Sequence, residues 1–173
     1  MNSSAQSRIF SIALLLLRFV LCVWVGAAAL YVITSVAEQT SPHFDTATRD
    51  LLATVRFPLY YKFGFIAHII AGTFGFLAWR AALPENRRRM LIILGLVTLS
   101  ALLIFLDFRL IYQPLQELIN PPGQPRGDEF VKMHNRSKYA NEVHVSLICL
   151  AAFLACWPVG SNNKANSQVS LPE

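Results

Sequence analysis

Four long runs without Asp, Glu, Lys or Arg restrict what this sequence can fold into. They hold nineteen, seventeen, seventeen and fifteen residues, at Phe19–Ala37, Phe63–Trp79, Met90–Leu106 and Val143–Trp157. An α-helix rises about 1.5 Å per residue, so seventeen residues cover roughly 25 Å, close to the hydrocarbon thickness of a bilayer. Charged residues make up only 14% of the chain, against about 25% in soluble domains. The sequence therefore predicts an integral membrane protein whose main partner is the lipid bilayer.

The predicted fold class is all-α, an integral membrane four-helix bundle that forms a single domain over residues 1–173. With their flanking residues, the four runs become spans at about 12–37, 60–82, 89–108 and 130–158. The fourth run is the shortest, and a helix that starts near Asp128 gives it enough length. We expect Asp128 to accept the free amides of the first helical turn. Residues 160–173 are polar and are predicted to form a disordered tail.

The start of the chain allows two interpretations. Arg8 precedes an apolar stretch, and Ala27-Ala28-Ala29 is compatible with the cleavage site of a signal peptide. Arg18, however, interrupts the apolar region, and the run continues past the alanines through Val36. We therefore expect this segment to be retained as the first span.

The distribution of basic residues predicts how the spans are oriented. The short segment 80–89 holds four arginines and a single acid, Glu85, whereas the connections on the opposite side are longer and contain eight acids. Because Lys and Arg accumulate in short cytoplasmic loops, both termini are predicted inside (N-in/C-in), in the plasma (inner) membrane. The net charge of +5 comes largely from arginines beside apolar runs, which indicates membrane anchoring and not nucleic-acid binding.

A short amphipathic segment lies between the first two spans. Leu51, Leu52 and Val55 fall on one helical face of Thr48–Phe57, and Pro58 follows directly. Proline in a helix interior removes a hydrogen bond and commonly ends the helix. The pattern predicts a short helix in the outer interface, with its apolar face towards the membrane and its end at Pro58.

The fourth span carries a polar stripe. At about 100° per residue, one face roughly 80° wide collects two imidazoles, a hydroxyl and a carboxamide among apolar residues: Phe130, His134, Ser137, Asn141, His144 and Ile148. Such groups are unsuited to lipid, so the stripe is predicted to face the other helices. Two roles stay open, namely interhelical hydrogen bonds that hold the bundle together and a binding site.

The second span has a row of small residues around a histidine. Gly64, His68 and Gly72 follow one another at four-residue spacing, and small residues let helix backbones approach closely in lipid. The row suits packing within one bundle and packing in a homo-oligomer equally well. His68 is either a structural hydrogen-bonding residue or a ligand, since the neighbouring glycines leave room for a flat cofactor.

Three charged residues lie at or near membrane depth. Asp107 and Arg109 end the third span on the predicted outer side, near the expected depth of His68 and His144. Ionisable groups in a membrane are costly and commonly functional. One hypothesis therefore joins six residues in an outer cluster: His68, Asp107, Arg109, His134, Asn141 and His144. The other treats Asp107 and Arg109 as ordinary interfacial charges. Arg18 either lies in the membrane, where it must snorkel or pair with an acid, or anchors the inner surface.

Three segments resemble one family. Phe130-x-x-Met133-His134-x-x-Ser137-x-x-x-Asn141 resembles the F-x-x-L-H-x-x-S-x-x-x-N signature of transmembrane protein 205-like proteins (domain of unknown function 4149). Trp24-Val25-Gly26 is similar to the W-x-G element of that family, and Leu110-Ile111-Tyr112-Gln113-Pro114 is similar to its I-x-P element. Met133 replaces a leucine, and Glu142 follows where an apolar residue is usual. The resemblance implies a small multi-pass membrane protein without an established reaction, in which His134, Ser137 and Asn141 are important.

Three functional hypotheses follow. The first is a non-enzymatic structural, interaction or transport-related membrane module without a cofactor, because the sequence lacks the common catalytic motifs. The second is a membrane redox protein that binds haem b or a metal through His68 with His144 or His134, since helix bundles can hold cofactors between facing histidines. The third is a membrane enzyme in which Asp107 and a histidine form a proton-transfer pair.

Overall fold

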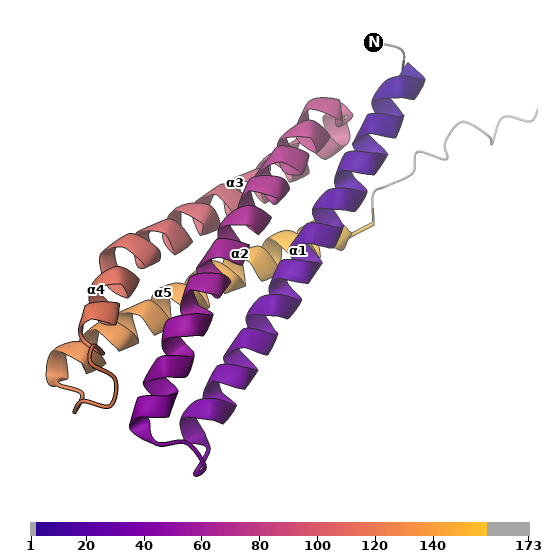
Figure 1. Cartoon of the computed structure of the whole chain (residues 1–173). Coiled ribbons are helices and arrows are strands. Elements are labelled where there is room, and N and C mark those ends of the chain that lie inside the picture. Colours follow the sequence, from indigo (N-terminus) through magenta and orange to yellow (C-terminus); the bar gives the residue numbers. More distant parts are fainter. Residues whose placement is uncertain (1–2, 159–173) are drawn as a thin grey trace, which may run out of the picture.

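The computed structural model describes residues 3–158, and every regular element in that range is helical (Figure 1). In chain order the elements are α1 Ser3–Thr40, α2 Thr46–Ala81, α3 Pro84–Asp107, the π-helical turn η1 Phe108–Tyr112, α4 Gln113–Glu117 and α5 Asp128–Cys156. The prediction of an all-α fold is confirmed for these residues. The predicted tail at 160–173 lies outside the described residues.

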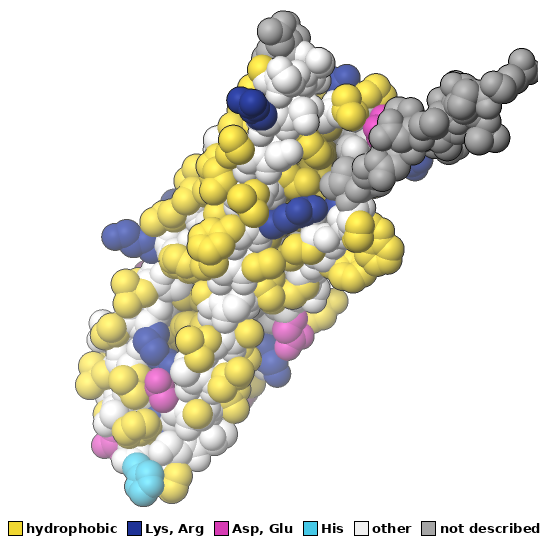
Figure 2. All heavy atoms as spheres, turned by 90° about the vertical axis from the view of Figure 1, so that its right-hand side faces the viewer, with side chains coloured by type: hydrophobic (Ala, Val, Ile, Leu, Met, Phe, Trp, Pro, Cys, Tyr) yellow, Lys and Arg dark blue, Asp and Glu magenta, His cyan; other side chains and the backbone are white. Residues whose placement is uncertain are grey.

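Four helices are long and apolar enough to cross a membrane: α1, α2, α3 with its continuation to Glu117, and α5. Their outer surfaces expose large apolar side chains, such as Phe19 at 65% and Ile69 at 68%. Figure 2 shows hydrophobic side chains spread over the face it presents. So much exposed apolar surface is unfavourable in water and suits lipid, which agrees with the predicted membrane-spanning helices.

The four long helices form a ring in the order α1, α2, α3, α5, in which each packs against two neighbours and runs antiparallel to them (Figure 1). Aliphatic side chains from three of these helices fill the centre, including Leu17, Leu21, Ile93, Val97 and Ile148. The helix α2 contributes small buried residues instead, among them Gly64, Ala67, Ala71 and Ala78. Because these buried residues of α2 are small, the backbone of α2 can lie close to α1 and α3.

The row of small residues on α2 is used mainly within the chain. Gly64 and His68 are buried, and a Cβ placed on Gly64 would lie only 2.8 Å from the Trp24 ring. At Gly72, by contrast, an added Cβ would meet no atom within 4 Å. Of the row predicted to serve a homo-oligomer, only Gly72 is therefore open to a second copy, and that oligomer stays a prediction.

The segment predicted as a separate interfacial helix is the first part of α2. Pro58 lies inside this helix and does not end it. Leu51 and Val55 are 56% and 65% exposed, whereas Asp50 is 1% exposed, so the apolar face of this segment points out of the bundle and the acid points into it. The aromatic ring of Phe57, just before the proline, packs against those of Tyr31 and Tyr112. Prolines are tolerated inside membrane helices that pack against neighbouring helices.

The starts of α2 and α5 are capped differently. Asp45 is the N-cap of α2 and accepts a hydrogen bond from the Thr48 amide at 2.8 Å. Hydrogen bonding from the side chain and then from the amide of Thr48 holds the pKa of the Asp45 carboxyl below its usual value. The helix α5 starts at Asp128 as predicted, but its N-cap is Gly127 and no side chain caps it. Asp128 lies instead in the first turn, where the helix dipole favours a negative charge.

Two arginines hold the C-terminal end of α5. Arg18 Nε donates to the carbonyl of Ala155 at 2.7 Å, and Arg89 Nη2 donates to the same carbonyl at 3.2 Å. Arg89 also donates to the carbonyls of Trp157 and Pro158. Carbonyls at a helix end lack intrahelical partners and carry partial negative charge, so cations suit them. Arg18 therefore pairs with the backbone of α5, a partner that neither sequence-based alternative included.

Candidate ligand-binding site

A cluster of polar and aromatic side chains is buried between the helices around Trp24 of α1. The Trp24 side chain is 2% exposed, and its ring centroid lies 5.1 Å from that of Tyr60, 5.9 Å from that of His68 and 6.3 Å from that of His144. Two helices, α2 and α5, thus send rings to one indole on α1. The tryptophan of the W-x-G element therefore lies at the centre of the bundle, whereas Gly26 is exposed.

Ser100 of α3 connects the two buried histidines. His68 Nε2 lies 2.9 Å from Ser100 Oγ, and His68 Nδ1 lies 2.8 Å from the Gly64 carbonyl oxygen. Ser100 Oγ also lies 3.1 Å from the His144 carbonyl oxygen and 3.5 Å from His144 Nδ1. The hydroxyl therefore joins α2, α3 and α5 at one point of the core.

The inner half of the polar stripe forms interhelical hydrogen bonds. Asn141 Oδ1 accepts a hydrogen bond from the Tyr60 hydroxyl at 2.6 Å and lies 2.7 Å from His144 Nε2. The Tyr60 hydroxyl lies 3.2 Å from the same His144 nitrogen. His144 is 1% exposed, so these partners replace the water that its ring would otherwise bind. At this level the stripe holds α5 against α2.

The geometry of the histidines does not fit haem. An axial ligand needs a free ring nitrogen and space for the macrocycle beside it. Both ring nitrogens of His68 and of His144 lie within hydrogen-bond distance of protein atoms. Ser100 joins the two rings, whose centroids are 6.3 Å apart. His134, the third candidate, is on the exposed outer part of α5.

Asp107 is buried but separate from the histidines. It is 3% exposed, and its Oδ2 accepts a hydrogen bond from the Tyr61 hydroxyl at 2.5 Å. Its Oδ1 forms no well-aligned hydrogen bond within residues 3–158, although the Ser137 hydroxyl lies near the carboxylate. Because no direct hydrogen bond joins Asp107 to a histidine in that range, the structure gives no geometric support to a proton-transfer pair.

The predicted outer cluster is thus divided. The structure brings together three of its members, His68, Asn141 and His144. Asp107 pairs with Tyr61, and Arg109 and His134 are exposed.

A cavity of about 420 Å³ lies between α1, α2, α4 and α5, near the end of the bundle where α1 ends and α2 begins. Small-molecule sites usually have volumes of roughly 300–1,000 Å³. Most of the wall is aromatic or aliphatic, including Tyr31, Phe57, Tyr60, Tyr112, Leu115 and Phe130. Four residues of the polar stripe also line this cavity: Phe130, His134, Ser137 and Asn141. The stripe therefore has two parts, an inner part that binds other helices and an outer part that faces the cavity.

Asp50 ties the start of α2 to the connection that precedes α5. Asp50 Oδ1 accepts a hydrogen bond from Arg126 Nη2 at 2.6 Å, and Oδ2 accepts one from the Gly123 amide at 2.9 Å. Gly123 has a φ of +86°, and a Cβ there would lie 3.1 Å from the Cβ of Ala47. A glycine is thus needed for both the backbone conformation and the close approach. Asp50 and Arg126 both line the cavity.

Replacing Asp50 by Asn is expected to open this connection more often. The amide can still accept one hydrogen bond, but the bond to Arg126 loses its charge, at a cost of about 1 kcal/mol or about fivefold in the open population. The measurement is the rate of trypsin cleavage after Arg126 in protein reconstituted in nanodiscs. The control is Glu129→Gln, which alters an exposed acid with no side-chain hydrogen bond within residues 3–158. Equal cleavage rates for both variants would contradict the role given to Asp50.

Several residues of the cavity wall were missed by sequence reasoning. Tyr31 and Ser35 lie within the first apolar run. In the sequence, Arg56 is only one of the charged residues in the connection between the first two spans. The sequence does contain one signal for this wall. The spacing of Asp50, Arg56 and Tyr60 places charged and hydroxyl groups along one side of a continuous α2. That spacing is visible only when the helix is allowed to continue through Pro58.

No protein-family model, no curated protein and no solved structure matches this chain. The resemblance to transmembrane protein 205-like proteins therefore stays a prediction.

Proposed function

We propose that this chain is a non-enzymatic integral membrane module that binds an amphiphilic small molecule in the cavity between α1, α2, α4 and α5. One observation carries the proposal: the outer part of the polar stripe lines a cavity of about 420 Å³ whose wall is otherwise mainly apolar. Polar groups that served only to join helices would be expected to have partners on those helices. The His134 ring has no hydrogen bond within residues 3–158, and Ser137, whose hydroxyl lies near Tyr61 and Asp107, also faces the cavity.

An amphiphile suits the composition of this wall. The apolar side chains offer burial to a hydrocarbon chain, and the few polar groups can fix the orientation of a head group. A molecule of this class partitions into the bilayer and can reach a cavity between membrane helices. The absence of a contact between Asp107 and a histidine in the described residues leaves binding as the better supported role.

The proposed topology puts both termini in the cytosol and the cavity near the outer surface. Its support is the basic segment 80–89, which lies at the opposite end of the bundle from the cavity. The plasma membrane is the proposed location, because a strongly basic short connection is typical of the cytoplasmic side there.

Membership of the transmembrane protein 205-like family is proposed on the position of the three resembling segments. Trp24 is central to the buried cluster, Tyr112 lines the cavity, and the stripe residues His134, Ser137 and Asn141 line it as well. Two of the three segments thus line the cavity, and the third lies in the buried cluster that adjoins the cavity through Tyr60. Their proximity would explain why a motif includes them.

Filling the cavity is expected to weaken binding. Ala53 lines the cavity and is 8% exposed, so Ala53→Phe places a ring in the space of the ligand and should lower affinity about tenfold or more. The probe is a dansyl-labelled decanoylglycerol with an uncharged head group, titrated into phosphatidylcholine nanodiscs. Its blue-shifted emission is measured above that of empty nanodiscs.

The matched control is Ala29→Phe, because Ala29 is exposed on α1 and does not line the cavity. Saturable binding to the natural chain and to Ala29→Phe, with a large loss in Ala53→Phe, is the expected result. No saturable binding to the natural chain, or equal binding to both variants, would overturn the proposal.

A further inference from the structure

The cavity wall has an excess of positive charge. Three cations, Arg56, Arg126 and Lys138, and one acid, Asp50, line it. Arg126 is already paired with Asp50, with 2.6 Å between Nη2 and Oδ1. Arg56 is the cation on the wall formed by α1 and α2, and its surroundings decide what this wall can bind.

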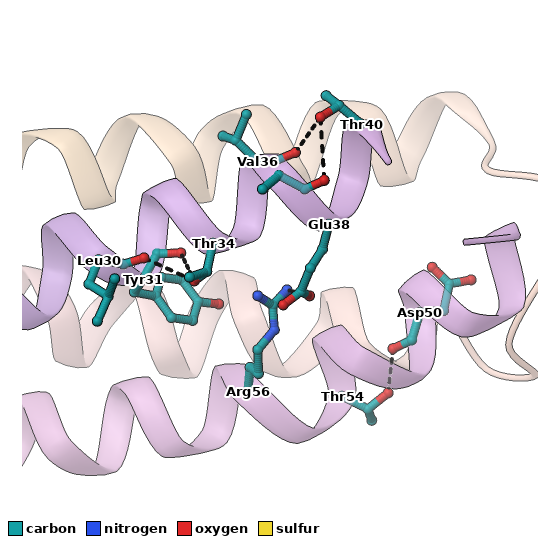
Figure 3. A network of polar contacts seen from close by, with 10 residues as sticks. Leu30, Tyr31, Thr34, Val36, Glu38, Thr40, Asp50, Thr54 and Arg56 are labelled. Carbon is teal, nitrogen blue, oxygen red and sulfur yellow. Dashed lines mark hydrogen bonds and ion pairs between the residues drawn. The ribbon is translucent and has the colours of Figure 1, made fainter. Parts of the chain in front are cut away.

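Arg56 is held in place but has unused hydrogen-bonding capacity. Its Nη2 lies 2.7 Å from Glu38 Oε2, and its guanidinium carbon lies 5.8 Å from the centre of the Tyr31 ring (Figure 3). Arg56 Nε and Nη1 are buried and have no hydrogen-bond partner within residues 3–158. Glu38 Oε2 also lacks an aligned hydrogen bond in that range. Arg56 and Glu38 are therefore held together by the attraction of their charges and not by a directional hydrogen bond.

Two hydroxyl groups lie on the same wall. Tyr31 and Ser35 are one helical turn apart on α1, and both line the cavity. Their hydroxyl oxygens are buried and neighbour each other, but neither forms a well-aligned hydrogen bond in the described part of the chain. Buried polar atoms in proteins are nearly always paired. Unpaired donors from Arg56, Tyr31 and Ser35 at one wall therefore indicate a ligand that accepts several hydrogen bonds.

We infer that Arg56, Tyr31 and Ser35 bind the oxyanion head group of an amphiphile, a carboxylate or a phosphate, whose chain lies against Phe57 and Tyr112. This inference rests on the proposed function and adds the chemical class of the ligand. Guanidinium N–H groups donate and never accept, and hydroxyl groups can donate, so an acceptor with negative charge suits all three residues. A cationic head group would be repelled by Arg56.

Glu38 is the competitor in this arrangement. It contacts Nη2 of Arg56 and leaves Nε and Nη1 to the ligand. Its negative charge opposes the oxyanion, so the affinity of the natural chain is lower than Arg56 alone would give. The two partners of one ion pair should therefore have opposite effects on anion binding when each is neutralised.

The test measures how unlabelled amphiphiles with the same decyl chain displace the uncharged dansyl probe. The four competitors are decanoate, decyl phosphate, 1-decanoylglycerol and decyltrimethylammonium. We expect the two anions to bind the natural chain about tenfold more tightly than the uncharged glycerol ester, and the cation to bind least. Comparison of decanoate with decyl phosphate then distinguishes a carboxylate from a phosphate head group.

Substitutions assign the effect to Arg56. Arg56→Gln is expected to remove the advantage of the anions, about tenfold, without changing the affinity for 1-decanoylglycerol. Glu38→Gln should tighten anion binding several-fold. The double variant Arg56→Gln with Glu38→Gln should stay weak, which separates loss of the guanidinium from repulsion by an unpaired Glu38. The control is Arg109→Gln, which removes an exposed cation that does not line the cavity.

The outcomes separate this inference from the proposed function. If 1-decanoylglycerol displaces the probe but the anions bind no more tightly, the inference is wrong and the proposed function stands. Unchanged anion affinity in Arg56→Gln would also overturn the inference. If no amphiphile binds saturably to the natural chain, both fail.

Discussion

His144→Ala is expected to lower the free energy of unfolding by about 3 kcal/mol. The imidazole is 1% exposed and lies beside Ser100, Asn141 and Tyr60. Its removal takes hydrogen-bonding partners from three helices and leaves a space next to Trp24. Thermal or denaturant unfolding of the protein in a fixed detergent, followed by tryptophan fluorescence, measures the effect.

The control is His134→Ala, on the same helix and of the same residue type. His134 is exposed and stacks on Phe130, with ring centroids 5.7 Å apart. Its loss should cost less than about 1 kcal/mol. If the two variants lose the same amount of stability, the buried network does not hold the bundle together. The distinction between an inner and an outer part of the polar stripe would then be wrong.

Gly64→Ala is expected to destabilise the bundle by about 2 kcal/mol. The new methyl group would lie 2.7 Å from Ile104 Cδ1 and 2.8 Å from the Trp24 ring. Trp24 is itself enclosed by Tyr60 and His144, so its ring has little room to shift. The strain therefore passes to the packing of α1 against α2, and the melting temperature in detergent should fall by several degrees.

Gly72→Ala is the matched control two helical turns further along α2. A Cβ there meets no atom within 4 Å, and alanine is favoured over glycine in helices by about 1 kcal/mol. The control should therefore be neutral or slightly stabilising in the monomer. Equal destabilisation by both substitutions would show that the close contact at Gly64 does not determine stability.

The helices could be predicted from the sequence because the uncharged runs are long and few. The start of α5 followed from Gly127 and Asp128, although the glycine and not the acid provides the cap. The prediction that a helix ends at Pro58 is wrong, because neighbouring helices can support a proline inside a membrane helix and local propensity does not include them. The apolar residues Leu51 and Val55 do face outwards, but the partners of the buried Asp50 could not be predicted, because Gly123 and Arg126 are far from it in the sequence.

The candidate site could be predicted only on one of its helices. Spacing on α5 placed Phe130, His134, Ser137 and Asn141 on one face, and the cavity lies against that face. The partners of this face could not be found in the same way. Ser100 is an ordinary small residue within an apolar run, and its contact with His68 depends on the relative height and rotation of α2 and α3.

The clamp formed by Arg18 and Arg89 on the end of α5 affects how the bundle can move. It joins α1 and α3 to α5 at one end, whereas the cavity lies towards the other end. Helices that are held together at one end move least at that end and most at the opposite end. Thermal bending of these helices should therefore widen and narrow the mouth of the cavity while the arginine end stays still, which would give a molecule from the bilayer a way in without separating the core.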